Sequence, residues 1–253
     1  MSEIILQCKG INKKYKKKDH YHIAANHINF DLKKGECLGI VGESGCGKST
    51  LARIIMNLEK CDSGEIILND NSITNIKGKK LSLMYKEMQM VFQDAIGSLN
   101  PKMTIGESIK EYVCSLCSVT KKDREEKVES LLELVGLSKE FKNRYPHELS
   151  GGQCQRVAIA RALSSHPKVL ICDEATSALD VSVQAQIIEL LIKMKKEFNI
   201  SYIFITHDLA LVSSFCDRVL VMKDGNIVEE GSVDKVINNP ENEYTKLLLS
   251  SIL

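Results

Sequence analysis

The apolar residues of this chain follow two patterns. Short apolar runs between turn residues are typical of buried strands, and apolar residues three or four positions apart are typical of one face of a helix. Runs of the first kind occupy residues 36–41, 65–69, 88–92, 169–172 and 202–205. The chain is therefore predicted to contain both strands and helices, with strands spread along much of its length.

The two ends of the chain add further strands. Residues 4–9 and 21–32 are predicted to be strands on either side of a basic turn at residues 13–18, whose lysines we expect mostly in solvent. Residues 218–222 and 227–229 flank an Asp-Gly pair, which is a strong signal for a tight hairpin turn. The second pair of strands is therefore expected to form a hairpin.

From about residue 104 to 165 the pattern is helical. A stripe of apolar residues at helical spacing ends at Gly136, which is a common residue at the end of a helix. The stripe consists of Val128, Leu131, Leu132, Leu134 and Val135. Because no Pro/Gly/Ser-rich linker borders this region, we expect a helical insertion. The tail, residues 232–253, is predicted to form two short helices broken near Pro240.

A glycine-rich stretch lies between the strand at 36–41 and a predicted helix at 51–56. It fits G-x-x-x-x-G-K-[ST], in which backbone N–H groups surround a phosphate, the lysine reaches the outer phosphates and the hydroxyl binds Mg²⁺. The strand before it and the helix after it favour a phosphate site over a structural turn. The stretch comprises Gly42, Glu43, Ser44, Gly45, Cys46, Gly47, Lys48, Ser49 and Thr50.

A second predicted helix begins at a residue suited to capping. Ser150, after Leu149, is a good N-cap, but Gly151 and Gly152 weaken the helix that follows. A close approach of the backbone to a ligand would compensate for this cost. We therefore interpret the stretch, which ends in Gln153, as a second anion-binding helix start.

Polar side chains follow several of the apolar runs. Asp173 and Glu174 are adjacent carboxylates at the end of a core strand, where they are costly unless a metal ion or a water molecule needs them. Asp173 is placed to hold Mg²⁺ through water, and Glu174 to polarise an attacking water. Gln93 can ligate Mg²⁺ or a water, and His207 is about equally well explained by a structural or a catalytic role.

An aromatic residue ahead of the phosphate loop can stack on an adenine ring. Tyr15 is a candidate, and Tyr21 and His22 compete with it. The residues themselves leave this choice open.

Composition argues against several other classes of protein. The 253 residues carry a net charge of +1, which gives no electrostatic argument for nucleic-acid binding. No run approaches the ~18 apolar residues of a membrane span, and we expect no signal peptide at the N-terminus. The nine cysteines are odd in number and scattered, which favours free thiols in a reducing compartment over a disulfide framework.

Some of the cysteines prompt hypotheses of their own. Cys114 and Cys117 are closely spaced, but no second pair completes a zinc site, so we expect buried or half-buried helix residues. Cys46 lies in the glycine loop near a helix N-terminus, where a thiol can become a reactive thiolate. The alternative is that Cys46 is a small filler, as Cys154 can also be.

Together these motifs resemble the ATP-binding-cassette (ABC) ATPases, in the family's order and over nearly the whole chain. The glycine loop is similar to the Walker A motif, Gln93 is similar to the Q-loop glutamine, and residues 149–153 are similar to the LSGGQ signature. Asp173 matches the end of the Walker B motif, and Glu174 matches the catalytic glutamate. Residues 177–180, which end in Asp180, resemble the D-loop, and His207 resembles the switch histidine. Tyr15 matches the family's adenine-stacking aromatic.

The resemblance implies one ABC ATPase domain over residues 1–253, of the α/β P-loop NTPase class. Such a domain has a RecA-like core, a small antiparallel β-subdomain and a helical subdomain, here at roughly residues 95–165. The implied cofactors are ATP and Mg²⁺, with Ser49, Gln93 and Asp173 around the metal ion.

The resemblance also implies partners. In this family two domains enclose two ATP molecules head to tail, so that Lys48 and the other motifs of one subunit face Ser150, Gly151 and Gly152 of the other. Hydrolysis is thus expected to need a second ABC ATPase subunit, either identical or homologous. Transmembrane permease subunits, and through them an extracytoplasmic substrate-binding protein, would place the chain at the cytoplasmic face of the cell membrane, with no nucleic-acid partner.

Two segments are similar to importers of dipeptides, oligopeptides and nickel. The first is residues 93–101, where Ala95 replaces the usual proline. The second is the tail at residues 243–248, where Asn242 and Glu243 replace His-Pro. The absence of a cysteine-containing extension after Leu253 slightly favours nickel or another metal chelate as cargo. We expect the ATP-hydrolysing, energy-coupling subunit of an importer for one of these cargoes.

The alternative is a soluble ABC-family ATPase that acts on nucleic acid or ribosomes. Chromosome-maintenance members carry a long coiled coil between the halves of the site, whereas only about 55 residues separate Gln93 from Leu149 here. Ribosome-acting members usually carry two cassettes in one chain. A third class, non-hydrolysing ATP sensors, is expected to lack Glu174 or His207, and both are present.

Overall fold

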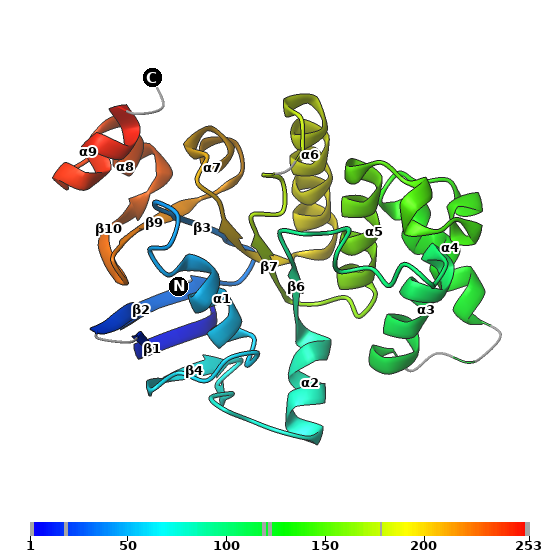
Figure 1. Cartoon of the computed structure of the whole chain (residues 1–253), viewed down its shortest axis with the longest axis horizontal. Coiled ribbons are helices and arrows are strands. Elements are labelled where there is room, and N and C mark those ends of the chain that lie inside the picture. Colours follow the sequence, from blue (N-terminus) through cyan, green and yellow to red (C-terminus); the bar gives the residue numbers. More distant parts are fainter. Residues whose placement is uncertain (1–2, 18–19, 118–119, 121–122, 178, 251–253) are drawn as a thin grey trace. The chain divides into compact units, whose positions relative to one another are not determined.

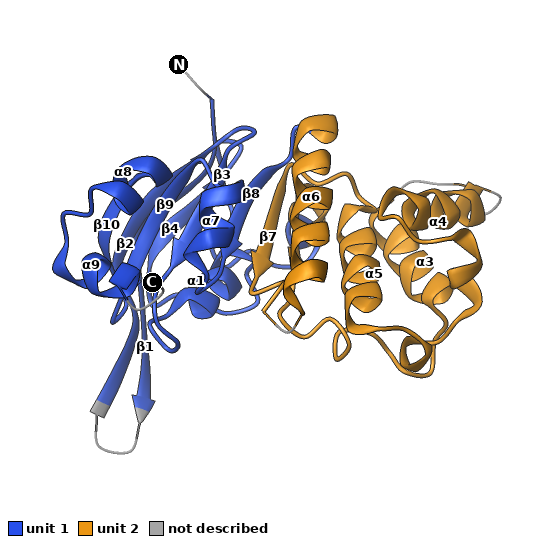
Figure 2. Ribbon diagram, turned by 90° about the horizontal axis from the view of Figure 1, so that it is seen from above, with its two compact units in different colours: residues 1–81, 199–253 blue, residues 82–198 orange. Residues whose placement is uncertain are grey.

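The computed structural model describes residues 3–17, 20–117, 120, 123–177 and 179–250. The chain divides into two compact units, one of residues 1–81 with 199–253 and one of residues 82–198 (Figure 2). The expected helical segment at 95–165 falls inside the second unit, which is longer than that segment. Among the described residues, no helix is long and apolar enough to cross a bilayer.

The first unit contains an antiparallel sheet with the strand order β2-β1-β4-β5 (Figure 1). Its strands are β1 (Ile4–Lys17), β2 (His20–Lys33), β4 (Ser63–Leu68) and β5 (Asn71–Ser72). The prediction of a basic turn at residues 13–18 is wrong for residues 13–17, which continue β1 and pair with β2. A strand tolerates successive lysines because the cross-strand ladder satisfies the backbone while long side chains reach into solvent.

Four further strands of the first unit pair side by side, and the glycine loop follows one of them. Strand β3 (Cys37–Val41) lies parallel to and between β8 (Ser201–Ile205) and β9 (Arg218–Lys223), and β10 (Asn226–Ser232) pairs antiparallel with β9. β3 and β8 are buried along their whole length, as their apolar sequences predict. The predicted hairpin turn is confirmed: Asp224 and Gly225 have φ of 47° and 77°, as a two-residue hairpin turn requires.

Short helices complete the first unit. They are α1 (Lys48–Ile55), α7 (Leu209–Phe215), α8 (Val233–Asn238) and α9 (Glu243–Ser250). Helices α8 and α9 lie on either side of Pro240, so the predicted break in the tail is confirmed within the described residues. Residues 251–253, which the prediction included, lie outside them.

The second unit is mainly helical. Its strands β6 (Met88–Val91) and β7 (Val169–Asp173) are parallel neighbours. Its helices are α3 (Ile105–Leu116), α4 (Asp123–Leu134), α5 (Gly151–Leu163) and α6 (Val181–Phe198), with short 3₁₀ turns at Lys139–Asn143 and Pro146–Glu148 (Figure 1). The predicted stripe, of which all but Val135 lies on α4, is buried except for Leu134, which is half-buried, and Gly136 follows with φ of 75°.

Helix α2 (Lys79–Glu87), which precedes β6, was not predicted. Met84 is its one buried side chain, so the segment lacks the apolar stripe from which a helix can be recognised. It nevertheless leads directly into β6, and Gln93 follows that strand two residues after its end.

Candidate nucleotide site

The glycine loop joins β3 to α1 in a conformation that excludes larger residues at two positions. Gly42 has φ of 151°, and a Cβ there would lie 2.2 Å from the carbonyl oxygen of Met222. Gly47 has φ of 112°, and its Cβ would lie 1.9 Å from the carbonyl oxygen of Ala24. The neighbouring backbone therefore shapes the loop, and only glycine fits at these positions.

Lys48 begins α1 and turns back across the loop. Its side chain is only 4% exposed, and its ammonium donates to the carbonyl oxygens of Gly42 at 2.7 Å and Glu43 at 2.9 Å. No side chain in the described part of the chain caps α1, so the first N–H groups of the helix and a lysine charge converge on one loop. Ser49 and Thr50 lie half-buried in the first turn of the same helix.

Two contacts from distant segments hold the loop. The N–H of Gly225 donates to the carbonyl oxygen of Cys46 at 2.9 Å, and the N–H of Glu43 donates to the hydroxyl of Tyr244 at 3.1 Å. Glu43, Ser44 and Gly45 form the exposed rim. The sequence had indicated no role for Tyr244, although it lies in the tail segment that resembles importers.

The cysteines singled out in the sequence differ in their burial. Cys46 is buried, and this burial raises the pKa of its thiol in spite of the nearby Lys48 charge. Burial therefore favours the alternative of a small filler at Cys46 over a reactive thiolate. Cys114 is exposed on α3, contrary to the expectation of burial, and Cys117 at the end of that helix is half-buried.

Tyr15 and His22, two of the three candidates for stacking on adenine, lie side by side. Tyr15 on β1 is directly opposite His22 on β2, with the rings stacked at 6.5 Å between centroids. The Tyr15 hydroxyl donates to the carboxylate of Glu59, and Lys13 lies 5.0 Å from the ring centre. Tyr21 is 58% exposed and, one position from His22, points to the opposite face of the sheet.

His207 leaves the sheet at the same edge as the glycine loop. β8 lies parallel to β3 with Ile205 opposite Ile40, so the segments that follow both strands emerge together. His207 is exposed there, and the next residue, Asp208, caps α7 by accepting a 2.8 Å hydrogen bond from the N–H of Ala210.

In the second unit, Gln93 and Glu174 are brought into contact. The side-chain amide nitrogen of Gln93 donates to a carboxylate oxygen of Glu174 at 2.7 Å. Asp173, the residue before Glu174, is only 4% exposed. Glu174 has φ of 47°, an uncommon and costly conformation for a residue other than glycine, which the sequence did not indicate.

The start of α5 is a complete capping box. The Ser150 hydroxyl accepts from the N–H of Gln153 at 3.3 Å, and the Gln153 side chain accepts from the N–H of Ser150 at 2.9 Å, so the predicted cap is confirmed. A Cβ at Gly152 would lie 2.5 Å from a methyl group of Val183 on α6. Packing against α6 thus also explains why glycine is needed at position 152, which the sequence interpretation had attributed to a ligand.

Asp180 caps α6. Its carboxylate accepts hydrogen bonds from the Ser182 hydroxyl at 2.7 Å and the Val183 N–H at 3.0 Å, and these hold the pKa of Asp180 below its usual value. The rest of the predicted 177–180 turn includes Ala178, which lies outside the described residues.

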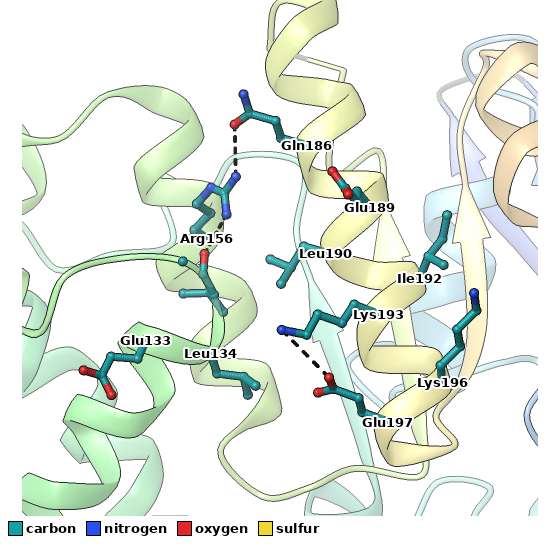
Figure 3. A pocket seen from close by; sticks show the side chains of 12 residues that line it. Glu133, Leu134, Arg156, Gln186, Glu189, Leu190, Ile192, Lys193, Lys196 and Glu197 are labelled. Atoms are coloured by element: carbon teal, nitrogen blue, oxygen red, sulfur yellow. Dashed lines mark hydrogen bonds and ion pairs between the residues drawn. The ribbon is translucent and has the colours of Figure 1, made fainter.

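A separate pocket of about 650 Å³ lies in the second unit between the end of α4, α5 and α6 (Figure 3). Arg156 crosses it, donating to the carbonyl oxygen of Val135 and to the side chain of Gln186. None of the predicted site residues lines this pocket. The pocket is therefore distinct from the motifs that the sequence singled out.

Comparisons with known proteins agree with this geometry. A family model described as ABC transporter matches residues 25–177. The chain is 45% identical over 254 residues to the oligopeptide transport ATP-binding protein OppF of Bacillus subtilis (strain 168), covering 100% of this chain and 83% of that protein. It is 49% identical over 230 residues to AppF of the same strain, described in the same words, covering 90% of this chain and 70% of AppF.

The fold has a counterpart among solved structures. A dimeric ATP-binding cassette in a post-hydrolysis state, bound to ADP and Pi, superposes with a TM-score of 0.82 at 31% identity, over 90% of this chain and 99% of that one. Fold and loop together define an α/β P-loop ATPase of the ABC type, with ATP as its nucleotide. The chain belongs to the ABC transporter family, which confirms the predicted fold class and family.

Proposed function

We propose that this chain is the ATP-hydrolysing, energy-coupling subunit of a peptide importer. The observation that carries the proposal is the 45% identity to an oligopeptide transport ATP-binding protein over the whole of this chain. Relatives at 46–49% identity that carry the same kind of description add to it. These descriptions favour a peptide over nickel or another metal chelate as cargo, and an importer subunit over a soluble ATPase for nucleic acid or ribosomes.

In this proposal the glycine loop and Lys48 bind the phosphates. Gly42 to Thr50 enclose them with loop N–H groups other than that of Glu43, which donates to Tyr244, and the ammonium of Lys48 exchanges its two carbonyl partners for phosphate oxygens. Tyr15 stacks on the adenine, with His22 beside it. Positioning and electrostatic stabilisation of the transition-state charge by Lys48, Mg²⁺ and the start of α5 from a second subunit would supply most of the rate.

The residues assigned to Mg²⁺ fit a hard cation. Ser49, Gln93 and Asp173 offer hydroxyl, amide and carboxylate oxygens, which Mg²⁺ prefers. Gln93 donates to Glu174 through its amide nitrogen, so its amide oxygen is not used in that bond. When bound, the ion neutralises charge on the outer phosphates.

Glu174 is the proposed catalytic base. Its carboxylate polarises the attacking water, Gln93 orients that carboxylate through the 2.7 Å hydrogen bond, and His207 supports the attack on the γ-phosphate. The start of α5 contacts the ATP of a second subunit through Ser150, Gly151, Gly152 and Gln153. Asp180 lies near the interface between the two subunits. Hydrolysis then requires a dimer.

The remaining partners follow from the transport role. Transmembrane permease subunits receive the motion, and an extracytoplasmic binding protein delivers the peptide, with this chain peripheral on the cytoplasmic face of the membrane. No nucleic acid takes part.

Uptake by cells tests the proposal. A strain that lacks this chain should lose uptake of a radiolabelled tripeptide or pentapeptide while keeping uptake of ⁶³Ni²⁺. The wild-type chain should restore it and the Lys48→Ala variant should not. Normal peptide uptake together with lost nickel uptake would reassign the cargo.

A further inference from the structure

Tyr244 contacts the glycine loop from outside the predicted motifs. Its hydroxyl, on α9, accepts the hydrogen bond from the N–H of Glu43 at 3.1 Å, at the point where the chain leaves β3 and the loop begins. We propose that Tyr244 is a positioning residue for the nucleotide site, which fixes the start of the loop and so tightens ATP binding. This inference rests on the proposed role of the loop in binding ATP.

The ring of Tyr244 is held by the same core as the strand that leads into the loop. Tyr244 is 7% exposed and packs in a buried cluster with Val41, the last residue of β3. The other buried members of the cluster are Leu209, Val212, Val219, Val221 and Val236. A rigid side chain packed in this way holds its hydroxyl at a fixed place. A water molecule that accepted the same hydrogen bond from Glu43 would not be fixed in this way.

The helix that carries Tyr244 also begins at a fixed place. The carboxylate of Glu229, on β10, accepts from the N–H groups of Glu241 at 2.8 Å and Asn242 at 3.1 Å. Asn242 in turn accepts from the N–H of Tyr244 at 2.9 Å. Burial opposes the charge of Glu229, but the hydrogen bonds outweigh it and keep the pKa of this carboxyl below its usual value.

The hairpin between β9 and β10 links Tyr244 to a second point of the loop. The ammonium of Lys223 lies 4.7 Å from the centre of the Tyr244 ring. Two residues further on, the N–H of Gly225 donates to the carbonyl oxygen of Cys46. Tyr244 and this turn thus hold the loop at its start and at its middle. Both contacts use loop backbone, so substitutions of Glu43 would leave the contact intact, and the test must change Tyr244.

The Tyr244→Phe variant removes the hydroxyl and keeps the ring in its cluster. In the presence of Mg²⁺, the Kd for the non-hydrolysable analogue AMP-PNP should rise about 2- to 10-fold, or about 0.4–1.4 kcal/mol, as expected for the loss of one hydrogen bond. Amide hydrogen exchange at Glu43 in the nucleotide-free protein should become faster by a similar factor. The melting temperature and the hydrolysis rate at saturating ATP should stay close to wild type.

Tyr85→Phe is the matched control, because Tyr85 is a half-buried tyrosine of α2 whose hydroxyl makes no hydrogen bond to the loop in the part of the chain that the structure describes. It should change neither the Kd nor the exchange of Glu43. A purely structural Tyr244 would lower the melting temperature of the Tyr244→Phe variant and leave its Kd unchanged, which would overturn the proposal. Unchanged exchange at Glu43 would overturn it as well. If the wild-type chain failed to bind AMP-PNP, the proposed function would fail with it, while faster exchange in the variant would still establish the contact.

Discussion

The glycine loop of the first unit and the Gln93–Glu174 pair of the second unit are held in different ways. Around the loop the neighbouring groups are largely backbone, such as the carbonyl oxygen of Ala24 against Gly47. The pair depends on one side-chain hydrogen bond of 2.7 Å, and Glu174 itself has φ of 47°. The loop is thus preformed largely by main chain, whereas the contact within the pair is set by side chains.

This difference predicts how each half responds to substitution. Backbone contacts survive most side-chain changes, so damage to the loop requires a change in the space beside a glycine or the loss of a side chain that bonds to loop backbone, such as Tyr244. A side-chain contact is removed by a single substitution. We therefore expect variants that displace the loop to change nucleotide binding, and variants of Gln93 or Glu174 to change turnover while binding is kept.

Glu174→Gln should show the largest effect. Loss of the proposed general base should lower kcat about 10²- to 10⁴-fold, while the Kd for ATP stays within about twofold of wild type. Phosphate release and equilibrium binding measure the two quantities. Glu189→Gln removes the same charge from an exposed position on α6 and should leave both unchanged. Hydrolysis by Glu174→Gln at the wild-type rate would reject the assignment.

Gly47→Ala should weaken nucleotide binding by about tenfold or more, because the new Cβ would lie 1.9 Å from a carbonyl oxygen and would displace the loop. Gly78→Ala is the control: Gly78 also has a positive φ, of 57°, but a Cβ there would meet no atom of the described residues within 4 Å. Titration with AMP-PNP compares the two. Equal affinities would mean that the backbone around the loop does not shape it.

Gly152→Ala should lower the free energy of unfolding by about 1–3 kcal/mol, because its Cβ would meet Val183 at 2.5 Å. Adding Val183→Ala makes room and should restore most of the stability, measured by urea denaturation. If Gly152 also approaches ATP, Gly152→Ala should lower the hydrolysis rate, and this rate should not recover in the double variant. Recovery of both stability and hydrolysis would assign Gly152 to packing alone.

The smallest expected effect is a difference between two cysteines, Cys46 and Cys114, in their rate of alkylation. Because burial raises the pKa of Cys46, its thiolate fraction at neutral pH lies below that of an ordinary cysteine and grows as the pH rises towards the pKa. Iodoacetamide at neutral pH should therefore modify the exposed Cys114 first, as peptide mass spectrometry can show. Modification of Cys46 at the same rate as Cys114 would mean that the loop opens readily.

Features that depend on a few consecutive residues were predictable. The cap at Ser150 and the turn at Asp224 and Gly225 follow from local side chains and local φ preferences, and both are confirmed. The strand character of residues 13–17 was missed because it depends on pairing with a distant strand. Helix α2 was missed because so few of its side chains are buried.

By itself, the sequence determined the family, the fold class and the glycine loop, because these are encoded in short motifs whose order along the chain is readable. Only the tertiary structure decided which distant groups meet those motifs. The hydroxyl of Tyr244 reaches the loop across a separation of 201 residues, and Gln93 reaches Glu174 across 81. Burial, which depends on the surrounding fold, also decided that Cys46 has a raised pKa. Such contacts arise from packing between segments remote in sequence, and no local pattern specifies them.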